Sequence, residues 1–259
     1  YLAPTAGTYY VRVGGAVAAP YSLVLTRDAE FGLETPDVVQ DIGSTGLVLG
    51  GLGSLGIGAG NLRVAVVASG SGGSYDAGLQ AIVNQLNDDT WYDFDANLVA
   101  PSAVDTYEEL AAYSVVVIGG SGYNSSQFNS FAPALRSYVE SGGGLLVTGW
   151  GIYAAGGLSG TTRTDFDAIV PVNTTGGYSS YGTTTVTPTG SHPIVDGLVA
   201  FSASPYVEYP SGSPRVDAGA TTLAMVGSVP VAAAMEVGLG HSVYLGPIYA
   251  GGSGYTTTS

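Results

Sequence analysis

The sequence of 259 residues contains no cysteine and no lysine. Without cysteine there is no disulfide, no thiolate nucleophile and no cysteine-ligated metal. All six basic residues are arginines, and together with twenty carboxylates they give a formal net charge of −14. A surface of that charge repels phosphate backbones and anionic lipid, so we expect no nucleic-acid partner.

Long apolar runs are also missing. The longest, such as residues 114–118 and 145–147, have the length of strands and fall far short of the roughly 20 residues that a membrane helix needs. We therefore predict no membrane span. No signal-peptide pattern is present, and the chain begins inside a strand-like pattern, so we expect it to be cut from a longer protein at both ends. Abundant glycine and tyrosine, at 41 and 18 residues, are typical of extracellular or cell-surface proteins, and we expect that location.

Residues 1–33 alternate between apolar and polar side chains with a period of two. The pattern predicts two half-buried antiparallel strands, at residues 9–13 and 21–26. Two strands alone are marginally stable in water. We expect them to dock on the rest of the chain or to support strand-mediated self-association through their exposed edges. Residues 34–61 are rich in glycine and predict a linker.

From Leu62 onward the pattern changes to βαβ units. Continuous apolar runs predict buried parallel strands near 62–68, 94–100, 113–119 and 144–149. Helical spacing predicts helices near 75–87, 105–112 and 125–141. Alternating strands and helices indicate an α/β fold of the flavodoxin-like type, a parallel sheet with flanking helices, preceded by a short antiparallel segment. Later short strands are predicted at 186–189, 216–218, 222–227, 231–237 and 242–246.

Three motifs in this region resemble the class I glutamine amidotransferase-like superfamily, and within it the trehalose-utilisation type. They are SYVESGGGLLVTGWG at 137–151, SHPIVDGL at 191–198 and GLGHSVYLGPIYA at 238–250. The resemblance implies one flavodoxin-like domain over residues 62–259, with its end cut short. At the start of the chain, AGTYYVRVGG and YSLVLTRDAEF resemble the last strands of the bacterial pre-peptidase C-terminal domain. This second resemblance implies an incomplete β-sandwich over residues 1–33 and a secreted bacterial protein.

The resemblance also implies that the family chemistry is lost. Catalytic members carry a cysteine in the turn after the strand that corresponds to 145–149, beside backbone N–H donors. Trp150 stands there in this chain, between Gly149 and Gly151. The matching stretch after the last strand, 245–249, lacks the histidine and glutamate of catalytic members. We therefore predict that Trp150 occupies and blocks this turn.

Serine does not replace the missing cysteine in any recognisable motif. The chain lacks Gly-x-Ser-x-Gly, and the nearest candidate, Ser121, reads more readily as a loop residue. His192 precedes a proline and is more readily a turn cap, whereas His241 is more readily a surface residue. We assign no catalytic residue, although Ser121 and His192 remain candidates for ligand binding.

Cofactor and metal motifs are incomplete. The loop at 70–74 could cradle phosphate at a helix N-terminus, but it departs from Gly-x-Gly-x-x-Gly and has no nearby lysine. We expect no cofactor. The carboxylates at 88–89, at 93 and 95, and at 165 and 167 could ligate calcium, yet their spacing fits no full loop motif. We assign no metal site and keep calcium as an open partner.

Aromatic residues supply the remaining candidates. Tyrosines gather in what the sequence suggests are late loops, and they provide contact area at low entropic cost. Together with Trp150 they would line the crevice at the carboxyl ends of the strands; they are Tyr178, Tyr181, Tyr206 and Tyr209. The leading hypothesis is a non-catalytic interaction or architectural module of a larger secreted protein, with other protein domains or surface glycans as partners. The alternatives are a hydrolase-like enzyme with an unassigned site, and a carbohydrate-binding module that uses Trp150 and the tyrosines.

Overall fold

The computed structural model describes residues 62–249, apart from residues 71, 89–93, 120–122 and 124. The predicted N-terminal strands, the glycine-rich linker and the expected cut ends lie outside these residues. The same holds for the resemblance to the pre-peptidase C-terminal domain and for strand-mediated self-association through the N-terminal strands. Ser121, Asp89 and Asp93 also lie outside them.

A parallel sheet forms the centre of the described domain, as the sequence predicted. Its strands are β1 (Leu62–Val67), β2 (Phe94–Val99), β3 (Val115–Ile118), β4 (Gly144–Thr148) and the late strand β11 (Gly240–Leu245). They lie side by side in the order β2-β1-β3-β4-β11, and every neighbouring pair is parallel. The inner strands are formed by apolar runs because they are covered on both faces; Val64 to Val67, for example, are at most 3% exposed.

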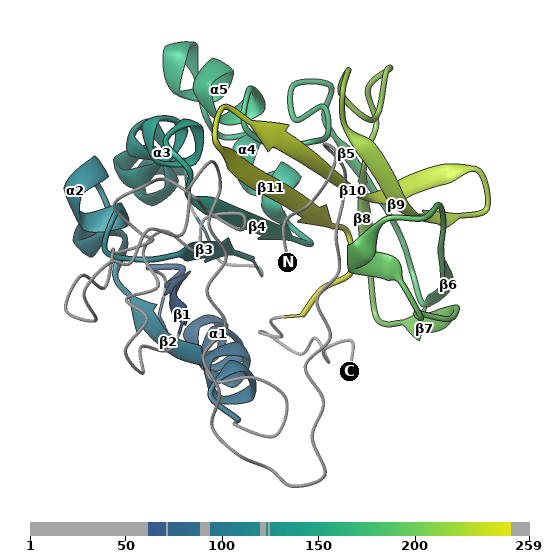
Figure 1. The fold of residues 1–259 in the computed structure, drawn as a ribbon, viewed down its shortest axis with the longest axis horizontal. Helices are drawn as coiled ribbons and strands as arrows, with labels where there is room; N and C mark the ends of the chain where they lie inside the picture. The colour runs from purple at the N-terminus through teal and green to yellow at the C-terminus, as the bar shows by residue number, and fades with distance from the viewer. Residues whose placement is uncertain (1–61, 71, 89–93, 120–122, 124, 250–259) are drawn as a thin grey trace, which may run out of the picture. The chain divides into compact units, whose positions relative to one another are not determined.

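Antiparallel strands extend this sheet beyond β11 (Figure 1). They are β10 (Val229–Val237), β9 (Thr221–Val226), β6 (Thr184–Pro188) and β7 (Phe201–Ala203). A separate two-stranded ribbon pairs β5 (Tyr178–Tyr181) with β8 (Val207–Pro210). The predicted strand at 216–218 is instead a single bridge between Val216 and Val172. The predicted tyrosine loops are also wrong in part, because Tyr178, Tyr181 and Tyr209 lie in the strands of this ribbon.

The helices lie on both sides of the sheet. One side carries α2 (Tyr107–Leu110), α3 (Ser125–Glu140), α4 (Gly151–Ala155) and α5 (Gly160–Asp167), and the other carries α1 (Ser74–Leu86) (Figure 1). Short 3-10 turns occur at η2 (Pro101–Ala103) and η3 (Pro193–Val195). None of the helices in the described ranges has the length and apolar character that a membrane crossing requires.

Helix α3 provides the largest part of the core. Its buried side chains recur at helical spacing, as predicted, and face the sheet; they are Phe128, Phe131, Leu135, Tyr138 and Val139. Burying one side chain of this size contributes about 1.5–3 kcal/mol. Phe128 packs edge-to-face on Phe131 and Phe166, with ring centroids 4.9 and 5.0 Å apart. This packing holds α3 and α5 in the same core cluster as α4, the helix that follows β4.

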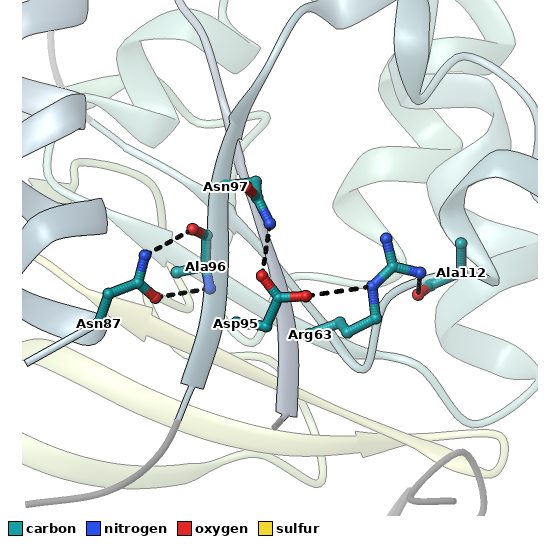
Figure 2. Close-up of polar contacts among 6 residues, drawn as sticks. All are labelled: Arg63, Asn87, Asp95, Ala96, Asn97 and Ala112. Carbon is teal, nitrogen blue, oxygen red and sulfur yellow. Dashed lines mark hydrogen bonds and ion pairs between the residues drawn. The ribbon is translucent and has the colours of Figure 1, made fainter. Parts of the chain in front are cut away.

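Strand β2 is the edge of the sheet, and one side chain covers its outer backbone groups (Figure 2). Asn87, which ends α1, accepts a hydrogen bond from the Ala96 N–H at 2.7 Å and donates one to the Ala96 carbonyl at 2.9 Å. Its amide therefore makes the two bonds that a neighbouring strand would make. An edge strand with unpaired backbone groups invites pairing with another chain, and Asn87 occupies the middle of that edge.

Candidate ligand site at the carboxyl ends of the strands

The turn after β4 is tight, as the sequence predicted. Trp150 is the N-cap residue of α4 and has a φ of 71° and a ψ of 3°. Among the described residues it is the only one other than glycine with positive φ. Both flanking glycines are required by close contacts: a Cβ at Gly149 would lie 2.6 Å from the Gly246 carbonyl oxygen, and one at Gly151 would lie 2.2 Å from Val147 Cγ1. The turn thus holds a bulky side chain in a conformation that costs about 1–2 kcal/mol.

Four aromatic rings meet at this turn, and we call them the aromatic cluster: Trp150, Tyr153, Tyr178 and Tyr206. Trp150 lies edge-to-face with the other three, at centroid distances of 5.7, 6.0 and 5.8 Å respectively. Tyr153 and Tyr178 lie 5.2 Å apart in the same geometry. These two tyrosines are 51% and 42% exposed. The cluster therefore combines a packed indole with two rings that face solvent.

The other two candidate tyrosines lie apart from the cluster. Tyr181 and Tyr209 stack on each other with centroids 4.8 Å apart, and both pack against the apolar core beneath the antiparallel strands. Arg215 lies 6.0 Å above the Tyr209 ring. Tyr178 and Tyr181 differ by an odd number of positions along β5, so they point to opposite faces of the ribbon. The structure thus divides the predicted tyrosines into a cluster with Trp150 and a separate packing pair.

A buried carboxylate lies directly behind the turn. Glu208, on β8, is 1% exposed. Its carboxylate accepts hydrogen bonds from the backbone N–H groups of Ile152 and Tyr153 at 3.1 and 2.9 Å, and from the Tyr244 hydroxyl at 3.0 Å. Burial raises the pKa of Glu208 to about 7, although these hydrogen bonds and the nearby Trp150 amide favour the charged form.

Glu208 lies at the N-terminus of α4, where its carboxylate meets backbone N–H groups of the first turn. The first N–H groups of a helix have no partner inside the helix and point toward an acceptor beyond its end. Here the protein's own carboxylate engages two of them. Glu208 is not among the residues predicted from the sequence; its signal there is a single acidic residue between the apolar Val207 and the aromatic Tyr209.

The two histidines do not take part in this site. His192 is the N-cap of η3, and its Nδ1 accepts a hydrogen bond from the Ile194 N–H at 3.2 Å, which is the turn cap that the sequence favoured. His241 is exposed near the start of β11, far along the strand from Leu245. Within the part of the chain that the structure describes, neither histidine is hydrogen-bonded to a serine.

Side chains of α1 and α3 hydrogen-bond to residues at the start of the glycine-rich loop before α1. The Asp76 carboxylate accepts hydrogen bonds from the N–H and the hydroxyl of Ser69 at 3.0 and 2.7 Å. Gln127, on α3, donates to the Gly70 carbonyl at 2.7 Å. Because Asp76 places a carboxylate in the first turn of α1, this helix end is a poor place for phosphate.

Three of the acidic residues proposed for calcium make other contacts in the structure. Asp95 lies 3.6 Å from Arg63 and accepts a hydrogen bond from Asn97 at 2.8 Å (Figure 2). Asp165 pairs with Arg136 at 2.8 Å, and Asp167 accepts two bonds from Thr174. Across the described ranges, no group of three or more histidine and carboxylate side chains could hold a metal ion.

Solved structures show what the domain resembles. A cytoplasmic protein of Salmonella typhimurium, STM1381, matches with a TM-score of 0.53 at 16% identity, over 72% of this chain and 88% of that one. A ThuA-like protein of Bacteroides uniformis matches with a TM-score of 0.52 at 16% identity, over 73% and 83%. The described domain has a ThuA-like fold. At this level of identity the likeness concerns the ThuA-like fold alone, and it confirms the fold that the trehalose-utilisation motifs implied.

The sequence matches no protein-family model and no curated protein sequence. Within the ThuA-like fold, the chemistry of the site therefore has to be inferred from the side chains at the turn after β4.

Proposed function

We propose that this chain is a non-catalytic binding module of a larger secreted or cell-surface bacterial protein, and that its aromatic cluster binds a neutral glycan. The observation that carries the proposal is the packing of Trp150 with the exposed rings of Tyr153 and Tyr178. Sugar rings present apolar C–H faces that pack on aromatic rings, while phenol hydroxyls hydrogen-bond to sugar hydroxyls. Tyrosine offers both contacts from one rigid side chain.

Two features support binding rather than acyl transfer. Trp150 stands in the turn where catalytic relatives carry their nucleophile, and an indole cannot attack a carbonyl. Glu208 engages the N–H groups of Ile152 and Tyr153, which are the donors that would otherwise stabilise an oxyanion. A substrate carbonyl would have to displace a buried carboxylate to reach them.

The charge of the chain favours a neutral ligand. A net charge of −14 disfavours acidic sugars and phosphorylated glycans by long-range repulsion. Glu208, whose carboxylate accepts hydrogen bonds from the α4 amides, is buried. A ligand on the exposed rings of Tyr153 and Tyr178 therefore meets aromatic surface and hydroxyl groups.

A panel of neutral and acidic oligosaccharides, measured by glycan array and then by calorimetry on the full chain, tests the proposal. We expect a neutral glycan to bind, and we expect Tyr153→Ala and Tyr178→Ala each to weaken that binding by about tenfold or more, by analogy with nucleobases stacked on aromatic side chains, which contribute about 1–3 kcal/mol each. The matched control is Tyr107→Ala, which removes a similarly exposed tyrosine, 41% exposed, from α2. Failure of every neutral glycan, or equal losses in all three variants, would overturn the proposal.

The hydrolase alternative is separated by activity assays. We expect the protein to hydrolyse neither glutamine nor p-nitrophenyl esters, and we expect Trp150→Cys alone to gain no activity, because the histidine and glutamate partners of catalytic relatives are absent from 245–249. The one observation that favours an enzyme is the raised pKa of Glu208, which suits general acid–base work. Ester or glycoside hydrolysis that disappears in Glu208→Gln would establish that alternative.

A further inference from the structure

Glu208 joins the two segments that supply the aromatic cluster. Trp150 and Tyr153 flank the first turn of α4, whose amides donate to the carboxylate. Tyr206 lies two residues before Glu208 in the chain, and Tyr178 belongs to β5, which pairs with β8 in register from Tyr178 opposite Pro210 to Tyr181 opposite Val207. The hydrogen bonds of Glu208 therefore link two segments. One is the start of α4, with Trp150 and Tyr153. The other is the ribbon of β5, which contains Tyr178, and β8, which follows Tyr206 in the chain.

The three hydrogen bonds described above for the carboxylate all come from donors. Two are backbone N–H groups, which cannot accept a hydrogen bond, and the third is the Tyr244 hydroxyl, which can donate or accept. An ionised carboxylate satisfies all three at once. A protonated one brings a hydrogen of its own, which only Tyr244 can accept, and it offers a weaker acceptor to the two amides.

We propose that Glu208 is the positioning residue of the aromatic cluster, and that its ionised carboxylate ties the first turn of α4 to β8 and so sets how Trp150 lies against Tyr206. The glycan-binding consequence rests on the proposed function, but the positioning role does not. Trp150 needs such support because its backbone is held in the left-handed region. Strained backbone persists where surrounding contacts over-determine it.

The ionisation of Glu208 falls in an accessible pH range, since burial raises its pKa to about 7. Tyr244, which faces it from β11, has a pKa raised well above its ordinary value by burial and by Glu208 itself. The ionisable groups on α4 and β5 are the tyrosines Tyr153, Tyr178 and Tyr181. On β10 and β11, Glu236 and His241 face each other at the opposite end of the ladder from Leu245. Apart from Tyr244, none of these side chains is hydrogen-bonded to the Glu208 carboxylate, so a change that Glu208→Gln abolishes reports on that carboxylate.

Tryptophan fluorescence tests the inference without any ligand. The chain has two tryptophans, so Trp91→Phe leaves Trp150 as the sole indole. In that background we expect the emission of Trp150 to change between pH 5 and 9 with a midpoint near 7, and we expect Glu208→Gln to abolish the change. Replacing both histidines, His192→Gln and His241→Gln, is the control and should leave the midpoint where it is.

A second variant keeps the test decisive if Glu208→Gln folds poorly. Tyr244→Phe removes one hydrogen bond that stabilises the ionised carboxylate, so the midpoint should move to higher pH. An emission that does not respond to pH in the Trp91→Phe protein, or a transition that survives Glu208→Gln or follows the histidines, would overturn the inference. The affinity for a neutral glycan should be lower at pH 5.5 than at pH 8, and it should fall over the same pH range as the fluorescence transition. A failure of glycan binding alone, with the fluorescence transition intact, would count against the proposed function and not against the positioning role.

Discussion

Replacing Trp150 by glycine and by alanine separates its backbone from its ring. Both changes remove the same indole and the same three ring contacts. They differ in backbone, because a φ of 71° is strained for alanine and unstrained for glycine. The left-handed conformation costs an L-residue about 1–2 kcal/mol. Glycine avoids this cost, but part of the gain, about 0.4–1 kcal/mol, is offset because an unfolded chain has more conformational freedom with glycine than with alanine.

The expected result is that Trp150→Gly is more stable than Trp150→Ala by about 0.8 kcal/mol, the difference between the middle values of these two effects. In urea, where a domain of this size has a slope of about 2 kcal/mol per molar, the unfolding midpoints should therefore differ by about 0.4 M. The order is informative because glycine is normally about 1 kcal/mol worse than alanine inside a helix. Equal midpoints, or a more stable alanine variant, would refute the left-handed turn.

Two further predictions concern other parts of the domain. Asn87→Ala removes both hydrogen bonds to the edge strand at Ala96, so we expect the free energy of unfolding in urea to fall by about 1–3 kcal/mol and light scattering to show concentration-dependent association. The control is Asn84→Ala, an exposed change one turn earlier on α1. An Asn87→Ala protein that stays monomeric would show that this edge needs no cover. Burial, and then the charge of Asp167, raises the pKa of Asp217 to about 6 from 3.8, so its stabilising contribution is present below the unfolded pKa and is lost as pH rises through about 6. Asp217→Asn should therefore raise the thermal midpoint relative to wild type more at pH 8 than at pH 4.5, and an equal effect at both values would contradict the assignment.

The parallel half of the fold was predictable because its signals are local and strong. Runs such as Leu62–Val67 and Val115–Ile118 contain almost no polar side chains, which marks strands covered on both faces. The stripe from Phe128 to Val139 repeats at helical spacing and lies in the core. The antiparallel half was harder to read: β5 is Tyr-Ser-Ser-Tyr, and its strand conformation depends on pairing with β8 rather than on its own pattern.

The site was predicted only in part, for two physical reasons. Membership of the aromatic cluster depends on which face of a strand a ring occupies, and this separates Tyr178 from Tyr181. Tyr153 was overlooked although it follows Trp150 by three residues, a spacing that brings side chains together in a helical turn. Glu208 contacts Ile152, 56 positions away in the chain, and no spacing rule in the sequence can reveal a contact of that kind.

The ladder between β4 and β11 has a consequence for how the domain assembles. It pairs His241 with Gly144 and Leu245 with Thr148, residues nearly a hundred positions apart, whereas the pairings of β10 with β9 and with β11 join near neighbours. Local contacts form early and distant ones carry a larger loop-closure cost. The central seam of the sheet should therefore close late, and Tyr244 and the turn at Trp150, which lie along that seam, would be completed only once both halves have formed.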